Sequence, residues 1–250
     1  MSSSDPAAPV VLITGAASGM GAECARTLAE RGYRVVAVDV NPDTTGLGKL
    51  ARSDDALVVH ADVSDARQAG QMVKSATDRF GRLDAAVNAA GVSQGMFVRT
   101  ADLGVDEWHR VMSINSDGLF FSLRAEIPAI LASGGGAIVN FGSTMSAAAS
   151  GSGISAYAAS KHAVLGLTRA AALEYAQDGL RVNAVAPGII ETPMTGGWDA
   201  GKRASQLAKH PVGRFGTAGE VAGLVAFLIS PAAAFVTGSL YPIDGGFGAQ

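Results

Sequence analysis

Cysteine, aromatic side chains and long runs of one residue class are scarce in this sequence. Its 250 residues include a single cysteine, Cys24, so the chain can form neither an internal disulfide nor a thiolate metal cluster. Cys24 falls in a predicted helix, where we expect it to be a small core residue. The longest apolar windows, such as 221–229, are too short to cross a bilayer, so no membrane partner is expected.

The patterns of charge and histidine argue against further classes of protein. The formal net charge is −3 and no basic run is present, which argues against a nucleic-acid partner. Residues 1–9 have neither the basic start nor the apolar core of a signal peptide, so we expect a disordered lead-in and a cytoplasmic protein. No metal is expected, because the four histidines lack metal-ligand spacing; they are His60, His109, His162 and His210.

Short β-branched runs alternate with helical patterns along residues 10–250, which we predict to be one α/β domain. The predicted strands are 10–13, 33–39, 57–59, 83–87, 137–141, 180–186 and 239–243. Alternating strands and helices imply right-handed βαβ units. We therefore expect a Rossmann-like, doubly wound parallel sheet of about seven strands flanked by helices. Two successive helices are predicted between 101 and 133, with Pro128 bending or ending the second.

A glycine-rich turn joins the first predicted strand to the first predicted helix. Thr14-Gly15-Ala16-Ala17-Ser18-Gly19-Met20-Gly21 precedes a helical pattern over 22–31. Small residues let the backbone approach a pyrophosphate, and a helix N-terminus offers unpaired N–H groups and the positive end of its dipole. The arrangement predicts a dinucleotide site; a tight turn without a ligand is the alternative.

Asp39 ends the second predicted strand, about 20 residues beyond the glycine-rich turn. An acid at this place can accept hydrogen bonds from both hydroxyls of an adenosine ribose, whereas a 2′-phosphate would repel it. No neighbouring cation compensates, because Arg34 begins the strand. We therefore predict NAD rather than NADP as the cofactor. A turn or N-cap aspartate before Asn41 and Pro42 is the alternative.

Tyr157 and Lys161 stand four residues apart in an Ala-rich run that is predicted to be helical, so they share one helix face. An ammonium about 4–5 Å away, at an effective dielectric of roughly 20, favours a phenolate by about 3–4 kcal/mol. This interaction would bring the pKa of the Tyr157 phenol toward neutrality and suit it to acid–base catalysis. Taken alone, the pair is more typical of two surface residues without chemistry, and the other motifs of the chain reverse that interpretation.

Together these motifs resemble the short-chain dehydrogenase/reductase family in its single-domain form, and the match covers nearly the whole chain. The matching segments are Thr14 to Gly21 for TGxxxGxG, Asn88-Ala89-Ala90-Gly91 for NNAG, Tyr157 to Lys161 for YxxxK, and Pro187-Gly188 with Thr192 for the nicotinamide side. The resemblance implies a catalytic tetrad of Asn115, Ser143, Tyr157 and Lys161.

The resemblance also implies residues that contact the cofactor and the substrate. The cofactor set is Gly15, Ser18, Gly19, Met20, Gly21, Asp39, Val40, Asp62, Val63, Asn88, Ala89, Gly91, Tyr157, Lys161, Pro187, Gly188, Ile190 and Thr192. The substrate set is Ser143, Met145, Tyr157, Met194 and Trp198. The loops that carry the substrate pocket hold few charges, which favours an apolar substrate.

Each member of the implied tetrad has a physical role. Ser143 would hold the substrate oxygen, and Tyr157 would exchange the hydroxyl proton. Lys161 would lower the pKa of the Tyr157 phenol and bind the nicotinamide ribose. Asn115 would hold a water molecule that links Lys161 to solvent as a proton relay. Ser143 lies about one residue farther from Tyr157 than is usual, so Thr144 is the rival hydroxyl.

We expect an NAD-dependent oxidoreductase that interconverts a secondary alcohol and a ketone. The alternatives are reduction of a 3-oxoacyl thioester, against which Asp39 argues, and a non-catalytic dinucleotide-binding redox sensor, which would not need the tetrad. Small residues along 156–176, with the family resemblance, predict a homotetramer. The long polar excursion 190–210 is expected to be a mobile lid.

Overall fold

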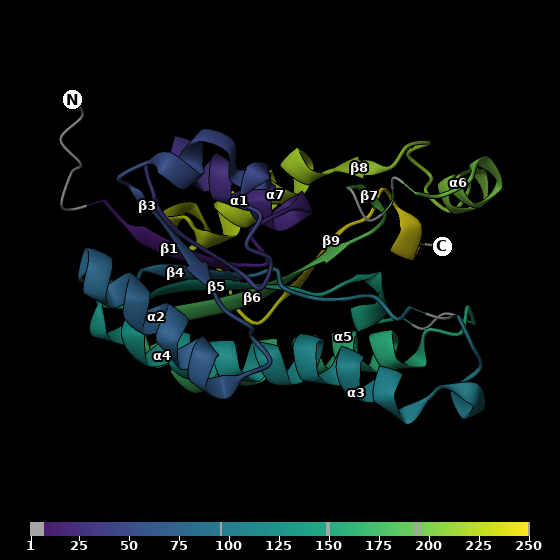
Figure 1. The fold of residues 1–250 in the computed structure, drawn as a ribbon, viewed down its shortest axis with the longest axis horizontal. Helices are drawn as coiled ribbons and strands as arrows, with labels where there is room; N and C mark the ends of the chain where they lie inside the picture. The colour runs from purple at the N-terminus through teal and green to yellow at the C-terminus, as the bar shows by residue number, and fades with distance from the viewer. Residues whose placement is uncertain (1–7, 96, 149–150, 193–194, 196, 250) are drawn as a thin grey trace.

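The structure is a computed structural model that describes residues 8–95, 97–148, 151–192, 195 and 197–249. Seven parallel strands form its central sheet in the order β3-β2-β1-β4-β5-β6-β9 (Figure 1). The strands are β1 Val10–Thr14, β2 Arg34–Asp39, β3 Ala56–His60, β4 Ala85–Asn88, β5 Gly136–Phe141, β6 Leu180–Pro187 and β9 Leu240–Ile243. The order runs outward in both directions from β1 and β4, which creates a crevice at their carboxyl ends.

Helices cover both faces of the sheet, which confirms the predicted doubly wound α/β fold (Figure 1). One face carries α1 Gly19–Glu30 and α7 Ala218–Ile229, and the other carries α2 Ala66–Phe80, α4 Gly118–Ala132 and α5 Ser155–Tyr175. The short helix α3 Val105–Met112 lies beside α5. A second, two-stranded sheet pairs β7 Ile190–Glu191 with β8 Gly216–Thr217, and α6 Ala200–Leu207 lies between them in the chain.

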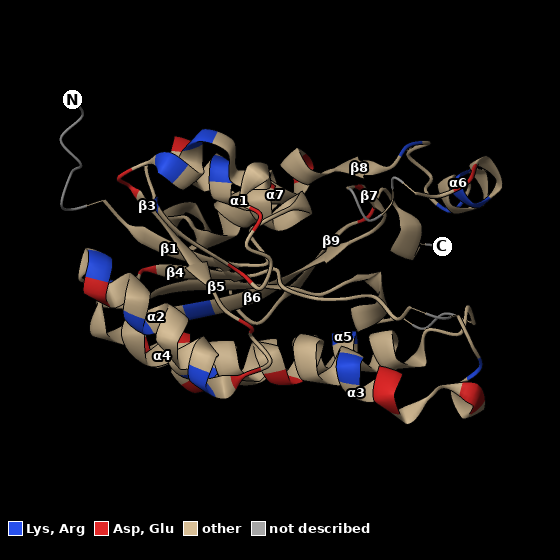
Figure 2. Cartoon of the chain, viewed as in Figure 1, with Lys and Arg blue, Asp and Glu red and all other residues tan. Residues whose placement is uncertain are grey.

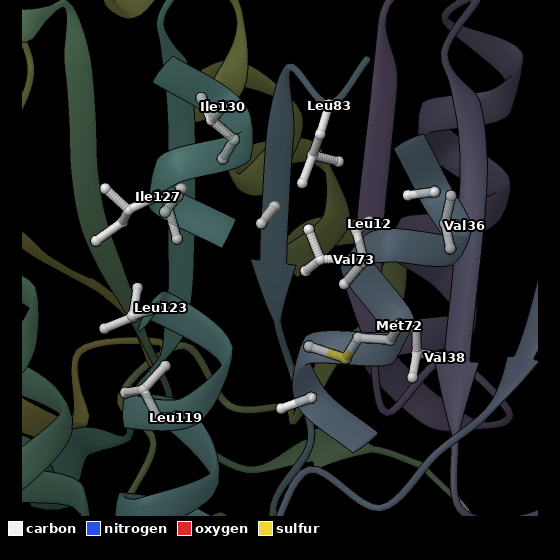
Figure 3. Close-up of a cluster of buried hydrophobic side chains, with 14 of the residues drawn as sticks. Leu12, Val36, Val38, Met72, Val73, Leu83, Leu119, Leu123, Ile127 and Ile130 are labelled. Atoms are coloured by element: carbon white, nitrogen blue, oxygen red, sulfur yellow. The ribbon is translucent and has the colours of Figure 1, made fainter. Parts of the chain in front are cut away.

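Two apolar clusters form the core, one on each face of the central sheet. Alternate residues of one strand point to opposite faces, so Leu12 joins one cluster while Val11 and Ile13 join the other. Figure 3 shows the first cluster, in which Leu12 and Val36 of the sheet lie beside Met72 and Val73 of α2, while α4 contributes Leu119, Leu123, Ile127 and Ile130. Burial on both faces explains why the central strands read as continuous apolar runs.

Pro128 does not end the second of the two helices predicted between 101 and 133. It lies inside α4, which continues to Ala132. A π-helical segment, Ser113–Asp117, joins α3 to α4, so the two helices follow each other without a loop. Such segments interrupt the regular backbone pattern and often occur at functional sites.

The structure shows where Cys24 and the charged residues lie. Cys24 is fully buried on α1, as predicted, and burial raises the pKa of its thiol to about 12. Figure 2 shows acidic and basic residues mixed over the helices that flank the sheet. Within the described ranges, no helix combines the length and the apolar character needed to cross a membrane.

Candidate active site

A cleft of about 930 Å³ lies at the carboxyl ends of the central strands. It is lined by the following residues of the predicted site: Gly15, Ser18, Gly19, Met20, Gly21, Asp39, Val40, Asp62, Val63, Ala89, Gly91, Ser143, Met145, Tyr157, Lys161, Pro187, Gly188, Ile190, Thr192 and Trp198. Asn88 and Asn115 do not line it and are instead buried beside a second, very small cavity that Lys161 also lines. Met194 lies outside the described residues.

The glycine-rich turn needs its glycines for two physical reasons. Gly15 and Gly19 adopt positive φ angles of 69° and 56°, which favour glycine. A Cβ at Gly21 would lie 2.1 Å from the carbonyl oxygen of Gly15, so any side chain there would clash with the backbone. Ser18, the N-cap of α1, makes no side-chain capping bond. The cleft therefore meets a helix N-terminus whose first N–H groups can bind a pyrophosphate.

The Asp39 carboxylate faces the cleft and also fixes the glycine-rich turn. One oxygen accepts a hydrogen bond from the Ala17 N–H at 2.9 Å, and the other accepts one from the Asn41 N–H at 2.9 Å. An ionised carboxylate has about four acceptor positions, so about two stay available for a ligand. The turn role that was the alternative for Asp39 is thus present, and it leaves room for ribose hydroxyls.

Asn115 fixes the backbone that follows β4. Its Oδ1 accepts a hydrogen bond from the Val92 N–H at 2.8 Å, and its Nδ2 donates to the Val92 carbonyl at 2.9 Å. The same Nδ2 donates to Ser160 Oγ at 3.0 Å. A Cβ at Gly91 would lie 3.2 Å from Asn115 Oδ1 and 3.5 Å from Lys161 Nζ. Gly91 thus keeps the space between these two side chains open.

Tyr157 and Lys161 lie on α5, as the sequence predicted, and both line the cleft. The Lys161 ammonium donates a hydrogen bond to the Phe141 carbonyl at 2.7 Å and lies 5.7 Å from the centre of the Tyr157 ring. Burial lowers the pKa of Lys161 to about 8, because a charged ammonium loses hydration in the interior. Lys161 is therefore mostly protonated at neutral pH.

We expected the pKa of the Tyr157 phenol to be lowered toward neutrality, and for the protein without bound ligands this prediction was wrong. Burial raises the pKa of the Tyr157 phenol, and a hydrogen bond from Ser143 opposes this rise only in part. Lys161 does not reverse it, because its ammonium is directed to the Phe141 carbonyl at the end of β5. The phenol consequently stays protonated in the free protein, ready to donate.

Ser143 follows β5 and is the hydroxyl that meets Tyr157. Its Oγ accepts a hydrogen bond from the Met145 N–H at 3.2 Å, while its own N–H donates to Ser146 Oγ at 3.1 Å. These bonds fix the side chain, and the Ser143 hydroxyl opposes the rise in the pKa of the Tyr157 phenol. Thr144 also lines the cleft.

Aromatic and basic side chains that the sequence analysis did not single out surround Trp198, which lines the cleft. Trp198 and Phe215 meet edge to face, with ring centres 6.3 Å apart. The Lys202 ammonium lies 4.8 Å from the centre of the Trp198 ring and 5.2 Å from that of Phe97. His210 accepts a hydrogen bond from the Ile189 N–H at 3.2 Å. Apart from the contact between Lys202 and Trp198, these contacts join segments far apart in the chain, so no local motif could indicate them.

Comparisons with known proteins identify the family. A family model described as enoyl-(acyl carrier protein) reductase matches residues 15–248. A cyclohexanol dehydrogenase of Acinetobacter sp. (strain SE19) is 43% identical over 95% of this chain and 94% of its own length. The chain belongs to the short-chain dehydrogenase/reductase family.

Other members of the short-chain dehydrogenase/reductase family act on different substrates. A 3-oxoacyl-[acyl-carrier-protein] reductase of Thermotoga maritima is 37% identical over 95% of this chain and 96% of its own length. A crystal structure of an actinorhodin polyketide ketoreductase with NADPH superposes with a TM-score of 0.91 at 34% identity, covering 99% of this chain and 100% of the other. Membership therefore implies a nicotinamide cofactor but leaves the choice between NAD and NADP open.

The features of the cleft fit a nicotinamide dinucleotide. The uncapped N-terminus of α1 suits the pyrophosphate, and Asp39 suits the adenosine ribose. No group of three or more His, Cys, Asp or Glu side chains that could hold a metal ion occurs in the part of the chain that the structure describes.

Proposed function

We propose that the protein is an NAD-dependent oxidoreductase that interconverts a secondary alcohol and its ketone. The observation that carries the proposal is that Ser143, Tyr157 and Lys161 line one cleft, where the Ser143 hydroxyl acts on the pKa of the Tyr157 phenol and the Lys161 ammonium lies 5.7 Å from the centre of the phenol ring. This arrangement gives a substrate oxygen two hydroxyl partners, one of which can transfer a proton.

The residues of the chain divide the chemistry between them. A bound nicotinamide cofactor supplies or accepts the hydride. Ser143 holds the carbonyl oxygen and stabilises its developing negative charge. Tyr157 donates a proton to that oxygen in the direction of ketone reduction and removes it in the direction of alcohol oxidation. Lys161 stabilises the phenolate that remains after donation, since its ammonium is mostly protonated near neutral pH.

The choice of NAD rests on Asp39. A 2′-phosphate beside it would bring about two negative charges against a carboxylate in a partly desolvated site, at up to about 4 kcal/mol for each contact at ~4 Å. The lysines among the described residues of the cleft lining are Lys161, Lys202 and Lys209. All three belong to α5 or to the α6 region, whereas Asp39 lies at the glycine-rich turn.

We propose a compact, largely apolar secondary alcohol as the substrate. The cleft lining includes Met145, Ile154, Phe97 and Trp198, whose side chains offer apolar contact and no carboxylate. The 43% identity to a cyclohexanol dehydrogenase adds cyclic alcohols to the substrates worth testing. A 3-oxoacyl thioester is the second candidate, supported by the reductase of Thermotoga maritima.

The test is a panel assayed by the absorbance of the reduced nicotinamide. Cyclohexanol, an acyclic secondary alcohol and a primary alcohol are each offered with NAD, and a 3-oxoacyl thioester is offered with NADH and NADPH. We expect turnover of secondary alcohols with NAD. Turnover of the thioester alone would select the second candidate, and dinucleotide binding without any turnover would select a redox sensor.

A homotetramer in the cytoplasm completes the proposal. Gly166, Ala170 and Leu173 of α5 are exposed, and Leu173 retains 81% of its surface. Phe120 of α4 is 49% exposed. Small residues beside exposed apolar ones allow close helix–helix packing between copies. Light scattering at micromolar concentration should report a tetramer; a monomer would contradict this part of the proposal.

A further inference from the structure

Glu126 of α4 is a carboxyl group in the apolar core, where a charge is costly. The side chain has no exposed surface. On the same helix, Leu123, Ile127 and Ile130 belong to the first core cluster (Figure 3). Burial raises the pKa of Glu126 to about 7, because a carboxylate loses its hydration there.

Glu126 and its hydrogen-bond partner Asn88 each have one buried oxygen that makes no hydrogen bond. Asn88 Nδ2 donates to Glu126 Oε2 at 2.9 Å and to Asn140 Oδ1 at 3.1 Å. The two remaining oxygens of this linked pair, Glu126 Oε1 and Asn88 Oδ1, are buried without a hydrogen-bond partner. Two acceptors cannot satisfy each other, but one added proton turns Glu126 Oε1 into a donor that Asn88 Oδ1 can accept.

The elements packed against α4 bring no cation to the carboxyl group. Neither β4 nor β5 carries a titratable side chain. The charged residues of α2 are exposed, as are Asp117 of the π-helical segment, Arg124 of α4, and His162, Arg169 and Glu174 of α5. On β6, Arg181 donates to the carbonyls of Leu228, Ile229 and Ser230. Lys161 donates to the Phe141 carbonyl. Because no neighbouring cation balances a negative charge on Glu126, the surroundings favour the protonated, neutral carboxyl group.

The hydrogen-bonded residues Glu126 and Asn88 lie directly beside a backbone segment that lines the cleft. Asn88 is the last residue of β4, and the residues directly after it, Ala89 to Val92, line the cleft. Asn115 fixes the far end of this segment through both backbone groups of Val92. Glu126 follows Asn115 by about three helical turns, because the π-helical segment continues directly into α4. This continuous stretch of helix therefore contacts the segment 88–92 at both ends, through Glu126 at Asn88 and through Asn115 at Val92.

We propose that Glu126 is a neutral carboxylic acid that forms a reciprocal hydrogen-bonded pair with Asn88 and thereby positions the cofactor-facing segment 89–92. Glu126 is a positioning residue, because it acts through Asn88 and does not touch the cleft itself. The part of the proposal that concerns the cofactor rests on the proposed dinucleotide site.

The first experiment compares wild type with Glu126→Gln from pH 5 to pH 8.5 by thermal unfolding. Glutamine keeps the shape and supplies a permanent donor, so it mimics the neutral acid. The folded state holds its proton up to about pH 7, whereas the unfolded chain loses it near pH ~4.3. The Tm of wild type relative to Glu126→Gln should therefore fall between about pH 4.5 and pH 7 and then level off.

Infrared spectroscopy tests the proton directly. The difference spectrum between wild type and Glu126→Gln at pH 6 should contain the carbonyl band of a protonated carboxylic acid. The matched control is Glu30→Gln, which removes an exposed carboxylate from α1 and should leave both readouts unchanged. A Tm difference that does not vary with pH, or a spectrum without the acid band, would overturn the proposal.

The second experiment tests positioning by measuring NAD dissociation constants. At pH 6, Glu126→Gln should bind within about two-fold of wild type. Glu126→Leu leaves Asn88 without its partner and should bind on the order of ten-fold more weakly. A folded Glu126→Leu protein with wild-type affinity would refute the positioning role. If that variant does not fold, the pH dependence of NAD binding by wild type relative to Glu126→Gln decides instead.

The two experiments separate the possible failures. If wild type itself does not bind NAD, the proposed function fails, while unfolding and infrared spectra still test the Glu126–Asn88 pair. If NAD binds but the Tm difference between wild type and Glu126→Gln does not vary with pH, the proposed Glu126–Asn88 pair is wrong and the proposed function stands.

Discussion

Lys161 donates a hydrogen bond to the carbonyl of Phe141 at 2.7 Å, and Ser143 lies only two residues beyond that carbonyl. One backbone segment at the end of β5 therefore fixes the ammonium and presents the hydroxyl. Tyr157, one helical turn before Lys161, meets both groups in the cleft. The arrangement explains how parts of the chain far apart in sequence form one site.

Tyr157→Phe should lower turnover by about 10²- to 10⁴-fold, because it removes the group that transfers the proton. NAD binding should stay within a few-fold, since the phenol provides only part of the cofactor contact. Steady-state kinetics and a fluorescence titration of NAD measure the two effects. Tyr33→Phe, at a half-buried phenol outside the cleft lining, is the control and should keep turnover. Wild-type turnover by Tyr157→Phe would rule out the assigned role.

Ser143→Ala and Thr144→Val separate the two neighbouring hydroxyls. We expect Ser143→Ala to lower kcat on the order of 10²-fold, as expected for the loss of one donor to the developing oxyanion. Thr144→Val should change kcat by less than about three-fold, because Ser143 is the hydroxyl that acts on the pKa of the Tyr157 phenol. The reverse order in kinetics measured under identical conditions would identify Thr144 as the catalytic hydroxyl.

Lys161→Met should make the protein more stable near pH 7 while it lowers activity. Burial lowers the pKa of Lys161 to about 8, so folding opposes the protonated form, and this cost disappears as the pH rises toward the unfolded value near ~10.4. The cost at pH 7 is up to about 3 kcal/mol, and the lost bond to Phe141 offsets about 1 kcal/mol of the gain.

Urea unfolding of wild type and Lys161→Met at pH 7 and pH 10 checks this prediction. The difference in free energy of unfolding should shrink at the higher pH. Lys49→Met, at an exposed lysine, should show no such trend. A Lys161→Met protein that is less stable than wild type at pH 7 would contradict it.

Asp39→Ala should reduce the preference for NAD over NADP. If about 2–3 kcal/mol of the repulsion remains after relaxation and salt screening, wild type should prefer NAD by about 30- to 100-fold. The variant also loses the bonds that Asp39 makes to Ala17 and Asn41, so its overall affinity should fall. The measurement is the ratio of kcat/KM for NAD and NADP at one salt concentration. An unchanged ratio would reduce Asp39 to a turn residue.

The segment predicted to be a lid, 190–210, should become more protected from hydrogen exchange when NAD and substrate bind together. It contains β7 and α6, and its residues Trp198, Lys202 and Gln206 line the cleft. Protection should rise in Ala200–Leu207, while α2, which contributes no residue to the cleft lining, provides an internal control. Equal exchange of α6 with and without ligands would argue against closure.

The sequence determined the sheet and the phosphate-binding turn because both depend on local patterns. Continuous apolar runs such as Val10–Thr14 are typical of strands in a parallel sheet that helices cover on both faces. The glycines of the turn are needed where φ is positive or where backbone approaches backbone, as at Gly15 and Gly21. Residues four apart on a helix share a face, which fixed the neighbourhood of Tyr157 and Lys161.

Tertiary structure alone decided the electrostatics and the long-range partners. The rise in the Tyr157 pKa, the drop in the Lys161 pKa and the raised pKa of Glu126 all come from desolvation. Desolvation depends on which segments cover a group, and a local pattern does not contain that information. Asn88 meets Glu126, 38 residues away, through a contact between β4 and α4, and Asn115 meets Val92, which is 23 residues away. Spacing along the chain could not indicate either contact, because packing of distant segments creates both.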